Sequence, residues 1–225
     1  GMIKVVLNLN LLYIKSTNIG EQKSILWKGK NVFTGIYKTP INSIVLGKED
    51  VNKDAVVDRK YHGGIDKACY LFSGDVYSRW KEKYPNLDWH FGMFGENLTV
   101  EGLDEREVFI GDQFCIGETL VEVSEPREPC FKLGIRFGTQ KVLKDFINQP
   151  HCGVYVRVLK QGKVKPQDKV ELFKRVQTDF SIARIFWLRN KATSEHKKEI
   201  LKAIDLSWLA KSAKQGLAMR LAVID

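Results

Sequence analysis

The sequence of 225 residues has no apolar run of the ~18 residues that a membrane-spanning helix needs. Its first residues show no charged and then apolar segment ending in a small-residue cleavage site, the pattern of a secretory signal. Its four cysteines, at positions 69, 115, 130 and 152, form no Cys-x-x-Cys pair, which excludes a zinc knuckle and a thioredoxin-type dithiol. We therefore expect a cytoplasmic protein with reduced thiols and no membrane partner.

The composition is that of an ordinary globular chain. Hydrophobic residues make up 44% and charged residues 28%, which excludes a wholly disordered or a collagen-like protein. Lys and Arg number 36 against 27 Asp and Glu, a formal net charge of +9. Such a charge is typical of a solvated basic surface, and it equally fits an anionic partner, either a nucleic acid or a phosphate-bearing small molecule.

Glycine and proline divide the chain in two. Residues 1–175 hold 17 of the 18 glycines and all six prolines. Within them, 121–123 and 154–158 alternate or are rich in β-branched residues, as strands are. Helical spacing interrupts this pattern only over 73–84 and 139–147. We predict a mainly β fold, a β-barrel with a few helices, over residues 2–175.

Residues 176–225 contain no proline and one glycine, and they favour three short helices. Apolar stripes lie at Ile182, Ile185 and Phe186 and again around Ile200. We expect Ser194 to cap the second helix and Ser207 the third, which would end near Gly216. With 9 basic against 5 acidic residues, this small appendage has a net charge of +4. We expect it to pack on the barrel, since fifty residues bury little by themselves.

Two glycine-containing segments hold candidate binding residues. In residues 58–70, paired glycines follow a histidine, and backbone N–H groups with nearby cations could hold an anion there; the charged candidates are Arg59, Lys60, His62 and Lys67. In residues 94–99, Glu96 and Asn97 could orient a polar ligand. The alternatives are a charged surface loop for the first segment and an Asx-type turn for the second.

A proline-rich segment singles out one thiol. In residues 126–133, two prolines three positions apart oppose a regular helix and stiffen the loop after the 121–123 strand. Cys130 follows the second proline, between Arg127 and Lys132, and neighbouring cations stabilise the thiolate that acts as nucleophile or soft-metal ligand. Cys69 and Cys115 have the apolar neighbours of core thiols, whereas the pair formed by His151 and Cys152 could be half of a metal site.

Together these segments resemble the MOSC family, named after the C-terminal domain of molybdenum cofactor sulfurase. The matching motifs, in the order of the family, are HGGIDKA at 62–68, GENL at 95–98, PREPCFKL at 126–133 and GVYVRV at 153–158. The appendage resembles the three-helix domain of one bacterial subgroup. Phe131 departs from the family pattern, since many relatives have Trp there.

The resemblance implies a MOSC-type β-barrel that binds molybdenum cofactor, a pterin with a dithiolene and a terminal phosphate. It implies a molybdenum-dependent reductase of N-hydroxylated compounds, such as N-hydroxylated base analogues, with Cys130 as the metal ligand and catalytic residue. It also implies a separate electron-donating reductase, because no flavin, haem or iron–sulfur motif is present. The residues expected to bind the cofactor are Arg59, His62, Gly63, Gly64, Lys67, Glu96, Asn97, Arg127, Lys132, Tyr155 and Arg157.

Other functions stay open at this point. Cys130 could carry a persulfide in a sulfurtransferase, which a pyridoxal-phosphate-dependent partner would load, or the chain could be a non-catalytic carrier of the cofactor. The basic appendage could bind nucleic acid, although it has no RNP, zinc-finger or other base-reading motif. The sequence leaves the oligomeric state open between a monomer and a homodimer.

Overall fold

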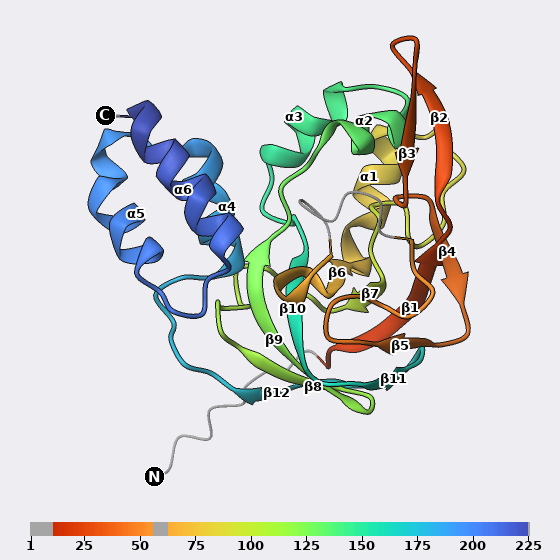
Figure 1. The fold of residues 1–225 in the computed structure, drawn as a ribbon, viewed down its shortest axis with the longest axis horizontal. Coiled ribbons are helices and arrows are strands. Elements are labelled where there is room, and N and C mark those ends of the chain that lie inside the picture. Colours follow the sequence, from red (N-terminus) through yellow and green to blue (C-terminus); the bar gives the residue numbers. More distant parts are fainter. Residues whose placement is uncertain (1–10, 56–62, 225) are drawn as a thin grey trace.

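A computed structural model describes residues 11–55 and 63–224, and its centre is an eight-stranded sheet (Figure 1). The strands lie in the order β12-β8-β9-β10-β6-β7-β1-β4. Among the described strands, β6 and β7 pair in parallel and the other neighbours of this sheet are antiparallel. The eight strands are β1 (Tyr13–Gly20), β4 (Lys38–Ile41), β6 (Cys69–Ser73), β7 (Leu98–Glu101), β8 (Gln113–Ile116), β9 (Thr119–Pro126), β10 (Val154–Lys160) and β12 (Val170–Lys174).

Backbone hydrogen bonds between distant parts of the chain close this sheet into a barrel. The amide of Ile14 in β1 donates to the carbonyl of Asp168 at 2.8 Å, and the amide of Val170 in β12 donates to the carbonyl of Leu12 at 2.9 Å. β4 pairs with the other half of β1. The predicted mainly β barrel is thus confirmed, and closure satisfies backbone groups that an open edge would leave unpaired.

Smaller elements surround the barrel. β2 (Lys23–Trp27) and β3 (Lys30–Thr34) form a hairpin, and β5 (Ile44–Leu46) pairs with β11 (Gly162–Val164). Lys28 and Gly29 have φ values of 49° and 74°, as the two-residue turn of this hairpin requires. The described helical segments between the barrel strands are η1 (Ile65–Lys67), η2 (Gly74–Val76), α1 (Tyr77–Lys83), α2 (Phe131–Phe137) and α3 (Lys141–Ile147).

The local predictions for the barrel are mostly confirmed. Residues 121–123 and 154–158 lie in β9 and β10, and the two helical intervals contain η2 with α1, and α3. The sequence did not predict α2, which begins at Phe131 directly after the proline-rich loop. Proline at 129 precedes the helix and therefore removes no hydrogen bond from it.

The appendage has the three predicted helices, α4 (Ile182–Lys191), α5 (Lys197–Ile204) and α6 (Lys211–Ile224), with η3 (Ser194–His196) before α5; they form a lobe beside β9 (Figure 1). Two predicted boundaries are wrong. Thr193, one residue before Ser194, is the N-cap, and its hydroxyl lies 3.2 Å from Nδ1 of His196. The third helix begins at Lys211 and passes through Gly216, where a Cβ atom would lie 2.6 Å from Nε of Arg189. Close helix packing therefore explains this glycine. The division at residue 175 stays a prediction.

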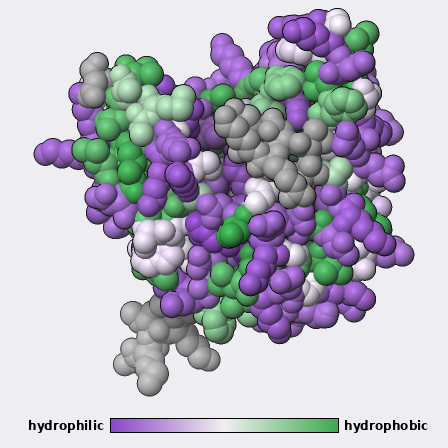
Figure 2. Space-filling view, viewed as in Figure 1, coloured by the Kyte–Doolittle hydropathy of each residue, from purple (hydrophilic) through white to green (hydrophobic). Residues whose placement is uncertain are grey.

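On the face in Figure 2 the surface is mainly hydrophilic, and hydrophobic side chains gather on the helical lobe. Exposed apolar residues of α5 and α6 include Leu201, Met219 and Val223. Within residues 11–55 and 63–224, no helix has the length and apolar character needed to cross a membrane.

Candidate functional site

One cavity collects most of the predicted site residues. Its walls come from β4, η1, β6, β10, the loop before β7 and the loop that joins β9 to α2. The predicted residues that line it are Gly63, Lys67, Asn97, Arg127, Cys130, Lys132 and Tyr155. Arg59 and His62 lie outside the described residues. Gly64, Glu96 and Arg157 are not in the described lining.

Cys130 is the N-cap of α2 and follows the loop that Pro126 and Pro129 stiffen. Its backbone is extended, and its carbonyl accepts a hydrogen bond from the amide of Leu133 at 3.0 Å. The thiol is half-buried, and among the four cysteines only Cys130 lines the cavity. Cys69 and Cys152 are fully buried, and burial raises the pKa of both thiols. Cys130 is thus the cysteine that a ligand in this cavity can reach.

Arg127 is a buried cation with no ion pair among the described residues. Its side chain is only 3% exposed, and its Nη1 donates to the carbonyl of Phe94 at 2.8 Å and to the Tyr70 hydroxyl at 3.3 Å. Its Nε has no hydrogen-bond partner in the described structure. Burial acts to lower the pKa of Arg127, but Tyr70, Tyr155 and Cys130 around it raise that pKa, so the net shift is upward. A charged guanidinium with an unused donor is what a site for an anion requires.

Two lysines add positive charge to the same cavity. Lys132, in the first turn of α2, is 8% exposed, and its side chain has no hydrogen bond or ion pair within the described residues. Nζ of Lys67 lies 3.8 Å from Oε1 of Glu125 and 5.4 Å from the centre of the Tyr155 ring. Among the described residues, the cations that line the cavity therefore outnumber the carboxylates that contact them, which favours an anionic ligand.

The sequence analysis missed an ion pair that also lines the cavity. Nζ of Lys38 lies 2.8 Å from both carboxylate oxygens of Asp54, and the two side chains are 8% and 4% exposed. Asp54 also accepts a hydrogen bond from Nδ2 of Asn97 at 2.6 Å, so it fixes the amide that the sequence did predict. Lys38 and Asp54 lie in no motif, and only the barrel brings them together; no local pattern could have found them.

Glu96 and Arg157 have partners outside the cavity lining. Glu96 is fully buried and accepts hydrogen bonds from the Thr99 hydroxyl at 2.9 Å and the amide of Phe94 at 3.2 Å; burial raises its pKa. Arg157 donates to Asp66 at 2.6 Å and to the carbonyl of Trp208 at 2.8 Å. These contacts hold the loop before β7 and join the barrel to the appendage. A direct role of either residue in ligand binding stays a prediction.

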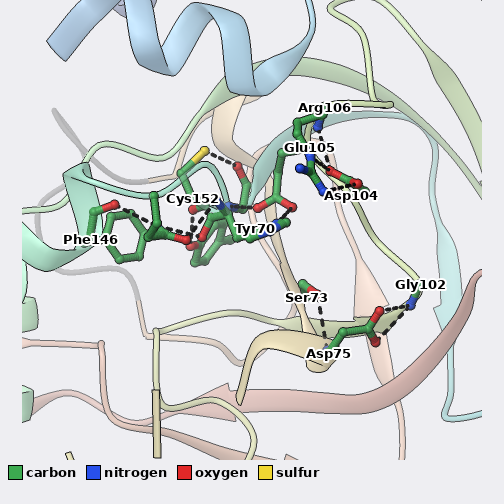
Figure 3. A network of polar contacts seen from close by, with 12 residues as sticks. Tyr70, Ser73, Asp75, Gly102, Asp104, Glu105, Arg106, Phe146 and Cys152 are labelled. Atoms are coloured by element: carbon green, nitrogen blue, oxygen red, sulfur yellow. Dashed lines mark hydrogen bonds and ion pairs between the residues drawn. The ribbon is translucent and has the colours of Figure 1, made fainter. Parts of the chain in front are cut away.

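A polar network behind the cavity fixes Tyr70 (Figure 3). The Tyr70 hydroxyl donates to the carbonyl of Cys152 at 2.7 Å, and Glu105 accepts from the amide of Gly153 at 2.9 Å. Glu105 also lies 3.2 Å from Nδ1 of His151. No group of three metal-ligating side chains occurs in the described part of the chain, so the half metal site suggested for His151 and Cys152 gains no further ligands.

Residues 58–171 match the MOSC domain family, and this range contains η1, the loop with Cys130 and β10. The chain belongs to the MOSC domain family. It is 37% identical over 170 residues to the uncharacterized protein YflK of Bacillus subtilis, covering 75% of this chain and 76% of that protein. It is 34% identical over 148 residues to YiiM of Escherichia coli, covering 64% and 66%.

A solved structure has the same overall fold. The crystal structure of YiiM from Geobacillus stearothermophilus aligns with a TM-score of 0.76 and 30% identity, covering 93% of this chain and 99% of that one. The alignment thus includes the helical appendage as well as the barrel. A protein of Gibberella moniliformis named "Reductase" is 37% identical over 127 residues, which cover 55% of this chain but 23% of that protein.

Proposed function

We propose that the chain binds molybdenum cofactor in this cavity, with the Cys130 thiolate as a metal ligand, and that it reduces N-hydroxylated compounds. The observation that carries the proposal is the buried Arg127 guanidinium, which has no carboxylate partner and an unpartnered Nε among the residues that the structure describes. A buried donor of this kind fits a ligand with a phosphate, and the half-buried thiol in the same cavity fits a soft metal. Membership of the family and the relative named reductase agree with it.

Different residues of the cavity would contact different parts of the cofactor, according to their chemistry. Arg127, Lys132 and Lys67 would hold the phosphate, since all three are cations of the lining. Asn97, oriented by Asp54, would contact a polar edge of the pterin. Arg59 and His62 stay predicted members of the same set.

The chemistry is a two-electron reduction, in which N–OH, two electrons and two protons give N–H and water. The bound cofactor would supply the two-electron redox chemistry at its metal. Tyr155 lines the cavity, and its hydroxyl, which is protonated at neutral pH, could donate a hydrogen bond to substrate. The proposal includes a separate electron-donating reductase.

The test compares Cys130→Ser with Cys115→Ser, a matched change at a half-buried thiol outside the cavity lining. Each protein is purified from a host that makes the cofactor, and its molybdenum, its pterin and its reduction of an N-hydroxylated adenine by a chemical donor are measured. We expect the wild type and Cys115→Ser to hold near-stoichiometric molybdenum and to be active. Cys130→Ser should be inactive at an unchanged melting temperature, because a hard hydroxyl replaces a soft ligand. Full activity of Cys130→Ser would overturn the proposal.

The same preparations distinguish the other functions. A persulfide on Cys130 without molybdenum would favour a sulfurtransferase. Molybdenum and pterin without reduction of any N-hydroxylated compound would favour a cofactor carrier. A protein that holds neither group but binds DNA in a salt-sensitive way would favour the nucleic-acid function.

A further inference from the structure

The segment that carries Arg127 and Cys130 is attached to the helical appendage at two points. Glu125, near the end of β9, accepts a hydrogen bond from the Ser212 hydroxyl of α6 at 2.7 Å. Glu128, in the loop after β9, accepts a hydrogen bond from Nδ2 of Asn190 of α4 at 3.0 Å. The two carboxylates thus flank Arg127, and the second precedes Cys130 by two residues.

Glu125 is buried and Glu128 is half-buried, and both depend on these partners because burial limits the access of water as an alternative donor. Glu125 is 4% exposed; burial raises its pKa, Lys67 and Arg157 oppose that rise, and Asp66 adds to it. A buried carboxylate that loses a hydrogen-bond donor pays the desolvation penalty in full. The hydrogen bond from the appendage therefore stabilises each carboxylate in the position that it occupies in the structure.

Glu128 shows the same dependence. Nδ2 of Asn190 lies 3.3 Å from one carboxylate oxygen of Glu128 and 3.0 Å from the other. Within the described residues, no salt bridge of 4 Å or less neutralises this carboxylate, so the Asn190 amide is its main donor.

A stiff backbone connects the two glutamates to the residues that face the cavity. Pro126 and Pro129 fix φ on either side of Arg127 and Glu128, which leaves the segment few soft torsions. Cys130 then begins α2 as its N-cap. A shift of either glutamate would consequently move the guanidinium and the thiol that face the cavity.

We propose that Asn190 and Ser212 are positioning residues, which hold Arg127 and Cys130 in place through Glu128 and Glu125. The importance of this positioning for catalysis rests on the proposed function, whereas the test of the positioning does not. In this arrangement the appendage completes the site without lining it.

The test measures the alkylation rate of Cys130 by iodoacetamide in a Cys115→Ser background, followed by mass spectrometry between pH 6 and 9, in protein prepared without the cofactor. Cys69 and Cys152 are fully buried and serve as internal references. Asn190→Ala and Ser212→Ala should each raise the rate about three- to tenfold, because losing one such hydrogen bond lowers the free energy of local opening.

Three further variants separate positioning from general loosening. Ser207→Ala makes the same change at an exposed serine of the α5–α6 connector, for which the described structure gives no side-chain hydrogen bond, and should leave the rate unchanged. Ser212→Thr keeps the hydroxyl and should restore the wild-type rate. Glu128→Gln keeps an acceptor for Asn190 and should also react as the wild type does.

The outcomes can be read separately. Unchanged alkylation in both Asn190→Ala and Ser212→Ala would overturn the positioning role, whatever the protein binds. Equal acceleration by Ser207→Ala would do the same, because it would show a general loosening of the lobe. If wild-type protein purified from a cofactor-producing host contains no molybdenum or pterin, the proposed function is overturned, but the alkylation result still stands.

Discussion

Glu128→Gln should stabilise the protein above neutral pH. Burial raises the pKa of Glu128 to about 7 from an ordinary value of 4.5. Because one pKa unit corresponds to about 1.4 kcal/mol, ionising this carboxyl in the folded protein costs about 3 kcal/mol. The folded state binds the proton more tightly, so this contribution to stability is complete below pH 4.5 and is lost as the pH rises through 7. Glutamine does not titrate and avoids that loss.

Urea denaturation at pH 5, 6, 7 and 8 measures the effect as the difference in unfolding free energy between Glu128→Gln and the wild type. We expect a difference of less than about 1 kcal/mol at pH 5 that grows to about 3 kcal/mol in favour of the variant at pH 8. Because both proteins share every other titrating group, the difference isolates Glu128. A variant that is no more stable than the wild type at pH 8 would refute the reasoning.

Glu199→Gln provides a control of opposite sign. The hydrogen bond from Arg184 lowers the pKa of Glu199, so the pair contributes stability above the ordinary pKa of the carboxyl, and the contribution is lost as the pH falls. The two side chains are 39% and 31% exposed, so solvent screening limits the effect to less than about 1 kcal/mol. Glu199→Gln should therefore be slightly less stable than the wild type at pH 7 and should equal it near pH 3.

Three further substitutions test the site and its support. Gly153→Ala should destabilise the fold by about 2–4 kcal/mol in urea, because φ is +82° and a Cβ atom would lie 2.6 Å from the carbonyl oxygen of Leu71; a stable variant would contradict the packing. Arg127→Met should weaken binding of inorganic phosphate, measured by calorimetry at low salt, at least about tenfold, and unchanged affinity would remove Arg127 from the site. Cys69→Ser should lower the melting temperature but leave the activity per folded molecule unchanged, since the fully buried thiol is outside the cavity lining.

Local sequence patterns predicted the parts of the fold that depend on neighbours in the chain. In the strands at 121–123 and 154–158, apolar and polar residues alternate or β-branched residues are frequent. This pattern indicates a strand with a buried face. The loop with Cys130 was predictable for a similar reason, since two prolines act within a few residues. The start of α2 was not, because helix formation there depends on packing of Leu133 and Phe137 in the core.

Contacts between distant residues could not be predicted in this way. The barrel closes where Tyr13 meets Lys169, and the Lys38–Asp54 pair forms only because the fold brings β4 and the segment after β5 to one cavity. Arg157 shows the limit most clearly. Its place in a family motif predicts a ligand-binding residue, and that role stays a prediction. The contacts of its guanidinium with Asp66 and with the backbone of the appendage could not be predicted from any local pattern.

The way the carboxylates are used explains why this cavity suits an anion. Asp54 neutralises Lys38, and Glu125 is shared between Lys67 and Ser212. Neither is left for Arg127 or Lys132, which stay buried without a counter-ion among the described residues. A buried charge in that state costs several kcal/mol of stability, which the rest of the core must offset. An anion that binds in the cavity offsets part of this cost, so the uncompensated positive charge of Arg127 and Lys132 favours the binding of an anion.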